Sequence, residues 1–198
     1  MIELQQVYIQ YVNSFYSLYD CNLKIDCNTH LIENETYSAM AIMRVLSKID
    51  KHYKGEIFID DINLKNIKDK DLNIAYIPKN PVLLKNTFKN LNYVLKIRKI
   101  NKKDRINIIN STICKYNLQN LNKNIKKLNK NEQKIIALIR AIIRKPKYVL
   151  LENFFEDLDE NYINLATQIL KDAEQYSTII ACEKDFNEVF QDFKIINL

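Results

Sequence analysis

Glycine and proline are scarce in this chain of 198 residues, which contains one glycine, Gly55, three prolines and no tryptophan. A collagen-like sequence has glycine at every third position, and flexible linkers are rich in glycine and serine, so both are excluded. A Gly-rich phosphate-binding loop needs several glycines, because the backbone must approach the phosphates closely. The composition therefore also excludes an intact loop of that kind.

Long apolar runs and metal-binding patterns are missing as well. No run of about 18 apolar residues occurs, so we expect no transmembrane helix. Residues 1–4 lack the basic and apolar pattern of a signal peptide, which predicts a cytoplasmic protein. With two histidines and no C-x-x-C pair, we expect no metal site. The cysteines lie beside mostly apolar residues, which predicts small buried side chains in a reducing compartment; they are Cys21, Cys27, Cys114 and Cys182.

The charge is positive and comes almost entirely from lysine. The formal net charge is +6 and the pI is about 9.0. One explanation is the codon bias of an AT-rich genome, because Lys, Asn and Ile are all heavily used. The other is a basic face for nucleic acid or anionic lipid. A dedicated nucleic-acid reader would use more arginine for bidentate contacts.

The first part of the chain reads as short strands around one helix. Residues 2–11 alternate imperfectly between apolar and polar side chains, which predicts a half-buried strand, and residues 23–26 and 56–59 are typical of further strands. Residues 29–49 read as strand, polar loop and helix, because apolar residues recur at helical spacing from Ala39 to Ile49.

The second part alternates apolar strands with helices. Residues 74–77, 148–151 and 178–182 are continuously apolar, as in strands of a parallel sheet that is buried on both faces. Residues 131–144 predict a strong helix, which ends before Pro146. Residues 162–170 predict an amphipathic helix, and residues 195–196 a last short strand.

These patterns predict one α/β domain over residues 1–198. A mixed sheet core carries an antiparallel β subdomain and a small helical subdomain at about 88–145.

The order of several weak motifs is informative when they are taken together. Tyr11 follows the first strand, Gly55 begins a Gly-Glu-Ile strand, Pro78 ends a buried strand, and Leu158-Asp159 closes a turn after the apolar strand that ends in Glu152. In this order and spacing, the chain resembles the nucleotide-binding domain of ABC transporters over essentially its whole length. The resemblance implies a P-loop NTPase-like core of the ABC ATPase type.

The same alignment indicates that the phosphate loop is degenerate. The family's loop aligns with residues 33–41, where no glycine remains; Asn34, Thr36 and Ser38 are its weak cofactor-binding candidates. Ala39 stands where the resemblance requires the phosphate-binding lysine, and Met40 where it requires the Mg²⁺-binding hydroxyl. We therefore expect no cofactor, with ATP and Mg²⁺ bound only if this altered loop still holds them. Tyr11 matches the aromatic residue that stacks on adenine in the family, although a tyrosine at a strand end also serves packing.

The remaining motifs of the family are also altered at the positions that contact Mg²⁺ or take part in hydrolysis. Lys79 replaces the Mg²⁺-contacting glutamine, Glu152 the Mg²⁺-side aspartate, Asn153 the catalytic glutamate and Glu183 the switch histidine. An amide cannot accept a proton at neutral pH, so Asn153 cannot act as a base. The family's Leu-Ser-Gly-Gly-Gln signature is matched by Leu128 and four further residues: Asn129, Lys130, Asn131 and Glu132.

The resulting hypothesis is a pseudo-ATPase subunit of an ABC transporter, peripheral at the inner face of the membrane. The resemblance implies two partners, a transmembrane permease and a second ABC ATPase subunit in a homo- or heterodimer. The candidate contacts are Phe154 and Phe155, and in the helical insert Leu91, Tyr93, Val94 and Tyr116. The alternatives are a divergent but active ATPase and a soluble basic module that binds nucleic acid. A nucleic-acid partner is the less expected, because the basic helix at 105–116 has few aromatic residues to stack on bases.

Overall fold

The computed structural model describes residues 1–10, 16–32, 37–183 and 188–198 and contains two sheets. The antiparallel sheet has the strand order β2-β1-β4-β5, with bounds β1 Ile2–Gln10, β2 Tyr16–Ile25, β4 Lys54–Ile59 and β5 Ile62–Asn63. The parallel sheet has the order β6-β7-β8-β3-β9, with bounds β3 Thr29–Ile32, β6 Ile74–Ile77, β7 Tyr148–Glu152, β8 Thr178–Cys182 and β9 Lys194–Asn197. The predicted combination of an antiparallel β subdomain with a sheet core is confirmed, although β3 joins the parallel sheet before β4 and β5 complete the antiparallel one.

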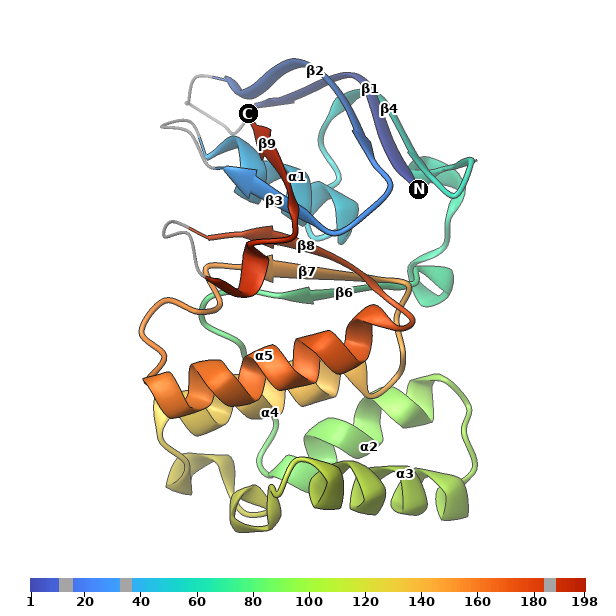
Figure 1. Cartoon of the computed structure of the whole chain (residues 1–198). Helices are drawn as coiled ribbons and strands as arrows, with labels where there is room; N and C mark the ends of the chain where they lie inside the picture. The colour runs from blue at the N-terminus through green and yellow to red at the C-terminus, as the bar shows by residue number, and fades with distance from the viewer. Residues whose placement is uncertain (11–15, 33–36, 184–187) are drawn as a thin grey trace.

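The described residues include five α-helices, of which α1 lies between the two sheets and the others lie on the far side of the parallel sheet (Figure 1). Their bounds are α1 Ser38–Leu46, α2 Thr87–Ile97, α3 Lys102–Lys115, α4 Lys130–Ile142 and α5 Glu160–Glu174. α1 lies between the two sheets, α4 and α5 cover the opposite face of the parallel sheet, and α2 and α3 lie beyond α4. Among the described residues, no helix is both long and apolar enough to cross a membrane.

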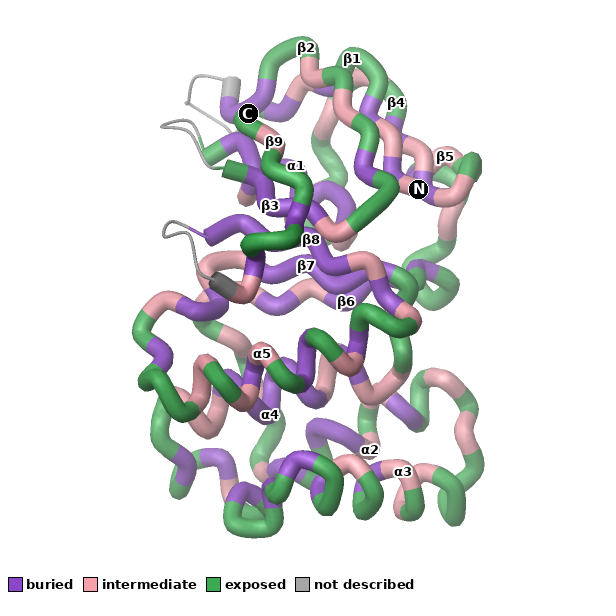
Figure 2. Tube along the Cα trace, viewed as in Figure 1, coloured by how far each residue is buried: buried purple, intermediate pink, exposed green. Residues whose placement is uncertain are grey.

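The central strand β7 shows why the parallel strands are continuously apolar. Val149 and Leu151 belong to the core formed with α4 and α5, whereas Tyr148 and Leu150 belong to the core formed with α1 and the antiparallel sheet. Successive side chains of a strand point to opposite faces, so both faces of β7 are buried (Figure 2).

The single glycine lies where two strands come unusually close. Gly55 has φ +87°, and a Cβ atom at this position would lie 2.1 Å from the backbone oxygen of Gln6 in β1. The register between β1 and β4 shifts in this region. No side chain fits there, which explains why glycine is kept at this one position.

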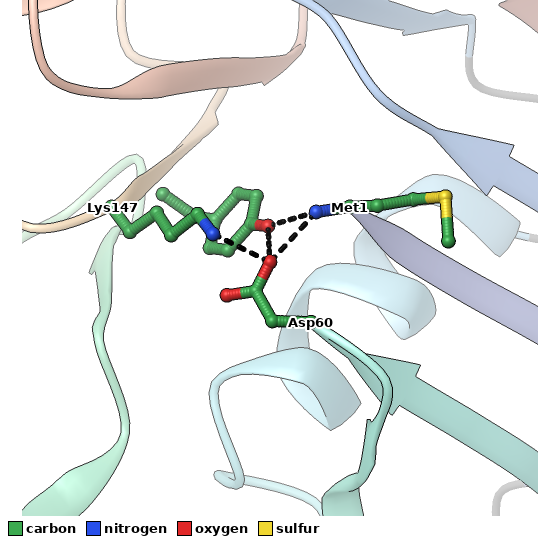
Figure 3. A network of polar contacts seen from close by, with 4 residues as sticks. Met1, Asp60 and Lys147 are labelled. Carbon is green, nitrogen blue, oxygen red and sulfur yellow. Dashed lines mark hydrogen bonds and ion pairs between the residues drawn. The ribbon is translucent and has the colours of Figure 1, made fainter.

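A polar network joins the antiparallel sheet to the parallel sheet (Figure 3). Asp60, after β4, accepts hydrogen bonds at its Oδ1 from the Met1 amine at 2.8 Å, Lys147 Nζ at 2.6 Å and the Tyr148 hydroxyl at 2.8 Å. Burial alone would raise the pKa of Asp60, but these three donors together hold it at about 2. The carboxylate thus links β4 to the start of β7.

The prediction that all four cysteines are buried is wrong in part. Cys182 in β8 is buried, Cys21 is half-buried, and Cys27 and Cys114 are exposed, all as free thiols. Cys27 lies in the polar turn between β2 and β3. Cys114 directly follows the buried Ile113, and a helix of 3.6 residues per turn directs the two side chains to different sides.

Candidate functional site

The carboxyl ends of the parallel strands bring the predicted catalytic positions to one edge of the sheet. Lys79 follows β6, Glu152 ends β7 and Asn153 follows it, and Glu183 follows β8. Glu152 pairs with Cys182 in the parallel ladder, which places Asn153 beside Glu183. Ligands bind at this edge in open α/β sheets, so the four residues form the candidate site.

Glu183 is buried and binds backbone rather than solvent. It is 5% exposed, and its two carboxyl oxygens accept hydrogen bonds from the Phe154 N–H at 2.6 Å and the Phe155 N–H at 3.2 Å. Burial raises the pKa of Glu183 to about 8, although both N–H groups and nearby Lys134 act to lower it. The carboxyl group therefore holds the turn formed by residues 153–156, which we call the 153–156 turn.

Two further buried side chains contact this region: Lys134 contacts the 153–156 turn, and His30 contacts the backbone of Glu183. Lys134 of α4 donates from Nζ to the Phe154 carbonyl at 3.0 Å and also to the Glu156 carbonyl. Burial lowers the pKa of this lysine. Nε2 of His30 in β3 lies 3.2 Å from the Glu183 carbonyl oxygen. Four elements of the fold thus meet at the 153–156 turn.

Lys79 forms an ion pair at the edge of the candidate site. Its Nζ lies 2.5 Å from Oε1 of Glu156, and this hydrogen bond raises the pKa of the lysine. A protonated ammonium has three donors and no acceptor, so it cannot ligate a metal ion. The neighbouring carboxylate of Glu152 accepts a hydrogen bond from the Tyr76 hydroxyl.

Asn153 has a special backbone conformation. Its φ is 42°, in the left-handed region where asparagine is tolerated, and its N–H donates to the Cys182 carbonyl at 2.8 Å. Its side-chain Oδ1 is buried and has no hydrogen-bond partner among the described residues. The amide can accept or donate a hydrogen bond, but it cannot remove a proton from water.

The start of α1 contains residues 38–41 of the segment that was predicted to align with the phosphate loop. Ser38 and Ala39 are buried, at 1% and 0% exposure, and Met40 is half-buried. Tyr37, before the helix, has φ 58° and is 60% exposed. The other binding candidates Asn34 and Thr36, as well as Tyr11, lie outside the described residues.

The residues that align with the signature loop form the first turn of α4. Asn129 caps the helix: its side chain accepts from the Glu132 N–H at 2.8 Å, and the Glu132 carboxylate accepts from the Asn129 N–H at 2.7 Å. Asn131 donates to the Asp159 carboxylate at 2.5 Å, whereas Lys130 is exposed. Three of the four side chains are therefore engaged in contacts within the chain.

Among the described residues, no group of three or more His, Cys, Asp or Glu side chains is arranged to hold a metal ion. The features of the site that known proteins can share are therefore its fold and the order of its motifs. A family model described as ABC transporter matches residues 41–155, which is more than half of the chain. The chain belongs to the ABC transporter family.

Individual ABC proteins agree with this assignment. The chain is 31% identical to the molybdate/tungstate import ATP-binding protein WtpC of Methanocaldococcus jannaschii over 114 residues, which are 56% of this chain and 38% of that protein. It is 24% identical to the sn-glycerol-3-phosphate import ATP-binding protein UgpC of Psychromonas ingrahamii over 176 residues, 86% of this chain and 47% of that protein. The chain thus spans less than half the length of both relatives.

Solved ABC cassettes share the fold. The dimeric ATP-binding cassette MJ0796, solved with ADP and Pi, superposes with a TM-score of 0.85 at 20% identity and covers 100% of this chain and 94% of that one. A bacterial Atm1-family ABC exporter with ATP bound gives a TM-score of 0.83 at 15% identity, with 100% of this chain and 36% of that one covered. The predicted ABC ATPase fold is confirmed.

The prediction that Phe154 and Phe155 contact an ABC partner is wrong. The two residues are 0% and 7% exposed, and their rings meet edge to face at 5.3 Å. Phe155 also packs on Phe190 at 5.4 Å. Both rings therefore belong to the core beneath the 153–156 turn.

The prediction that four residues of the helical insert contact an ABC partner is wrong in part, because some of them are buried. Leu91 and Tyr116 are buried, and the Tyr116 hydroxyl donates to Asp172 at 3.0 Å. Val94 is half-buried against the core, and Tyr93 is 55% exposed. Only Tyr93 of the four is fully available to an ABC partner.

Sequence reasoning missed three groups of this ABC-type site. Lys134 and Glu156 carry no motif signal, because their contacts at the site arise only from the tertiary fold. The pairing of Asn129 with Glu132 has a recognisable signal, an Asn-x-x-Glu sequence before an apolar helix, which predicts a capping box.

Proposed function

We propose that this chain is a catalytically degenerate nucleotide-binding subunit of an ABC transporter. It acts as a pseudo-ATPase that supports transport by pairing with an active ATPase subunit, with a transmembrane permease, or with both. One observation carries the proposal: the positions at which the resemblance requires the phosphate-binding lysine, the Mg²⁺-binding hydroxyl and glutamine, and the catalytic glutamate hold Ala39, Met40, Lys79 and Asn153, none of which can make the required contact.

The donor set does not fit Mg·ATP. Ala39 is buried and has no amine for the phosphates, and Met40 offers no hydroxyl to a metal ion. Lys79, the cation that replaces the family's glutamine, is paired with Glu156. No step of hydrolysis can be derived through a nucleotide held by these residues.

The acid–base groups for hydrolysis are missing as well. Asn153 stands at the position of the general base and is an amide. Glu183 stands at the switch position, and its carboxyl oxygens are engaged by the Phe154 and Phe155 N–H groups. Even a bound nucleotide would therefore lack a group to activate water.

An exposed apolar surface supports the permease interaction. Val82 is 86% and Leu84 43% exposed between β6 and α2, and Phe88 is 39% exposed in the first turn of α2. Exposed apolar residues in such a cluster mark protein interaction sites. We place the contact with a transmembrane permease on these three residues, which puts the chain at the inner face of the membrane.

Nucleotide binding tests the pseudo-ATPase proposal directly. Purified protein is titrated with labelled ATP and Mg²⁺, and we expect no binding below about 1 mM and no turnover, alone or with its partner subunits. The variant Ala39→Lys should stay inactive, because Asn153 and Glu183 remain in place. Sub-millimolar binding by the unmodified protein, or robust turnover by Ala39→Lys alone, would favour the divergent active ATPase instead.

Co-purification tests the partner. Permease subunits encoded beside this chain should co-purify with it, and Val82→Asp should weaken the complex because it places a charge in the apolar contact. Tyr19→Asp is the matched control, since Tyr19 is 71% exposed on β2, away from this surface. Equal retention of the permease by the unmodified protein and both variants would contradict the assigned surface.

A further inference from the structure

Charge is distributed unevenly along the chain. Residues 85–130 contain thirteen Lys and Arg residues and a single acid, Asp104. The remainder contains seventeen Lys and Arg against twenty-three Asp and Glu. A general bias toward lysine would leave the acidic residues evenly spread, so it does not explain this separation. The basic segment includes α2 and α3, at the end of the molecule farthest from the antiparallel sheet (Figure 1).

The end of α2, the start of α3 and the connection between them, residues 93–105, form what we call the α2–α3 tip. It carries four lysines that are exposed and make no ion pair with any described residue; they are Lys96, Lys99, Lys102 and Lys103. The one acid nearby, Asp104, accepts a hydrogen bond from the Asn101 side chain, whose oxygen in turn accepts from the Asp104 N–H, and its carboxylate offsets only one of the surrounding positive charges. The positive charge of the tip is therefore not neutralised within the protein.

Two apolar side chains stand among these lysines. Tyr93 is 55% exposed and Ile97 is 53% exposed. Residues three and four apart on a helix share a face, so Tyr93, Lys96 and Ile97 project from the same side of α2. The α2–α3 tip thus combines exposed apolar groups with unneutralised positive charge.

We propose that the α2–α3 tip docks on the surface of an anionic lipid bilayer. Lysines near such a surface attract its negative headgroups, whereas Tyr93 and Ile97 can enter the boundary between headgroups and acyl chains. Binding through this tip is independent of nucleotide and of the permease contact, so it goes beyond the proposed pseudo-ATPase function.

The side chains favour lipid over nucleic acid. The two arginines of the tip bind protein groups: Arg98 donates to Asn73 at 2.9 Å and Arg105 to Asn92 at 2.7 Å. Both guanidinium groups are thus partly engaged within the protein, whereas the charge that is left exposed is that of lysine, which lacks the bidentate geometry typical of nucleic-acid recognition. Tyr93 is the only exposed aromatic residue of the tip, and Ile97 offers nothing to a base or a phosphate.

Vesicle co-sedimentation of the full chain tests this proposal. The probes are phosphatidylcholine vesicles with and without 30% phosphatidylglycerol, at two salt concentrations. We expect binding only to the anionic vesicles and weaker binding at high salt. Each lysine near the surface contributes a factor of about five, so the quadruple variant Lys96→Gln, Lys99→Gln, Lys102→Gln and Lys103→Gln should bind at least a hundredfold more weakly.

Two comparisons make the test specific. A control with the same loss of charge, Lys24→Gln, Lys54→Gln, Lys68→Gln and Lys70→Gln, changes exposed lysines outside the basic segment and should bind nearly as the unmodified protein does. The double variant Tyr93→Ser and Ile97→Ser should bind severalfold more weakly while keeping the same salt dependence.

Three results would overturn the proposal. They are no binding of the unmodified protein to anionic vesicles, equal losses in the two quadruple variants, and tighter binding to a single-stranded RNA than to vesicles at the same salt. The last result would assign the α2–α3 tip to nucleic acid instead. None of them depends on whether the chain binds ATP.

Discussion

Replacing the buried Glu183 with glutamine should remove a pH-dependent loss of stability. The pKa of this carboxyl is about 8 in the folded chain, against an ordinary value of 4.5. A carboxyl with a raised folded pKa stabilises the fold fully below its unfolded pKa, and this contribution is lost as pH rises toward the folded pKa. At about 1.4 kcal/mol for each pH unit, raising the pH from 4.5 to 7.5 should lower the stability of the unmodified protein by about 4 kcal/mol.

The variant Glu183→Gln is uncharged at every pH, so it should not show this loss. Its amide oxygen can still accept a hydrogen bond from the Phe154 N–H, whereas its NH₂ group faces the Phe155 N–H, and two donors cannot bond to each other. This mismatch should lower the free energy of unfolding by about 1–3 kcal/mol at every pH. The measured quantity is therefore the difference in unfolding free energy between variant and unmodified protein at pH 4.5 and at pH 7.5, from urea titrations. We expect this difference to shift by about 4 kcal/mol in favour of glutamine at the higher pH.

Asp172→Asn is a suitable control for this experiment. Hydrogen bonds from Lys115 and Tyr116 lower the pKa of Asp172, so its carboxylate is ionised in both states throughout this pH range. The control difference should stay flat. An equally flat result for Glu183→Gln would refute the reasoning, because it would mean that the Phe154 and Phe155 N–H groups keep the buried carboxyl ionised.

Three further substitutions test the fold. Asp60→Asn should lower the free energy of unfolding by about 1 kcal/mol at pH 7, since it weakens the contact with Lys147 at a partly exposed site. The pKa of Asp60 is lowered to about 2. In urea titrations, the difference in unfolding free energy between variant and unmodified protein should therefore disappear as the pH approaches 2. Gly55→Ala should cost about 3 kcal/mol or more, because its Cβ would meet the Gln6 backbone oxygen at a positive φ; an unchanged urea midpoint would contradict the close approach of the strands. Asn129→Ala should cost about 1 kcal/mol and lower the melting temperature by about 2–4 °C, because it removes a helix cap; calorimetry is the check.

The buried strands were predictable from sequence because their burial is two-sided. Residues 148–151 and 178–182 are apolar at every position, and the structure places strands there with boundaries that differ by one residue at most. β2 was predicted only over residues 23–26, whereas it begins at Tyr16. Its earlier residues alternate poorly, because the pairing with β1 has several register shifts that interrupt the two-residue period.

The contacts of the candidate site were not predictable from sequence, because they join residues that are distant in the chain. Motif order placed Glu183 and Asn153 at the site. It could not indicate that the Glu183 carboxyl binds the N–H groups of residues 29 and 28 positions earlier. The packing of Phe155 on Phe190 likewise joins residues on either side of β8 in the sequence, so no local pattern indicates it.

The separation of charge between residues 85–130 and the rest of the chain gives the molecule a permanent electric dipole along its length. A polyanion or a cation-exchange resin would therefore attract the end of the protein that carries α2 and α3 first, whatever the net charge of the protein. Retention on such a resin should persist to pH values at which the molecule as a whole is close to neutral. Its orientation on any negative surface is then fixed before a specific contact forms.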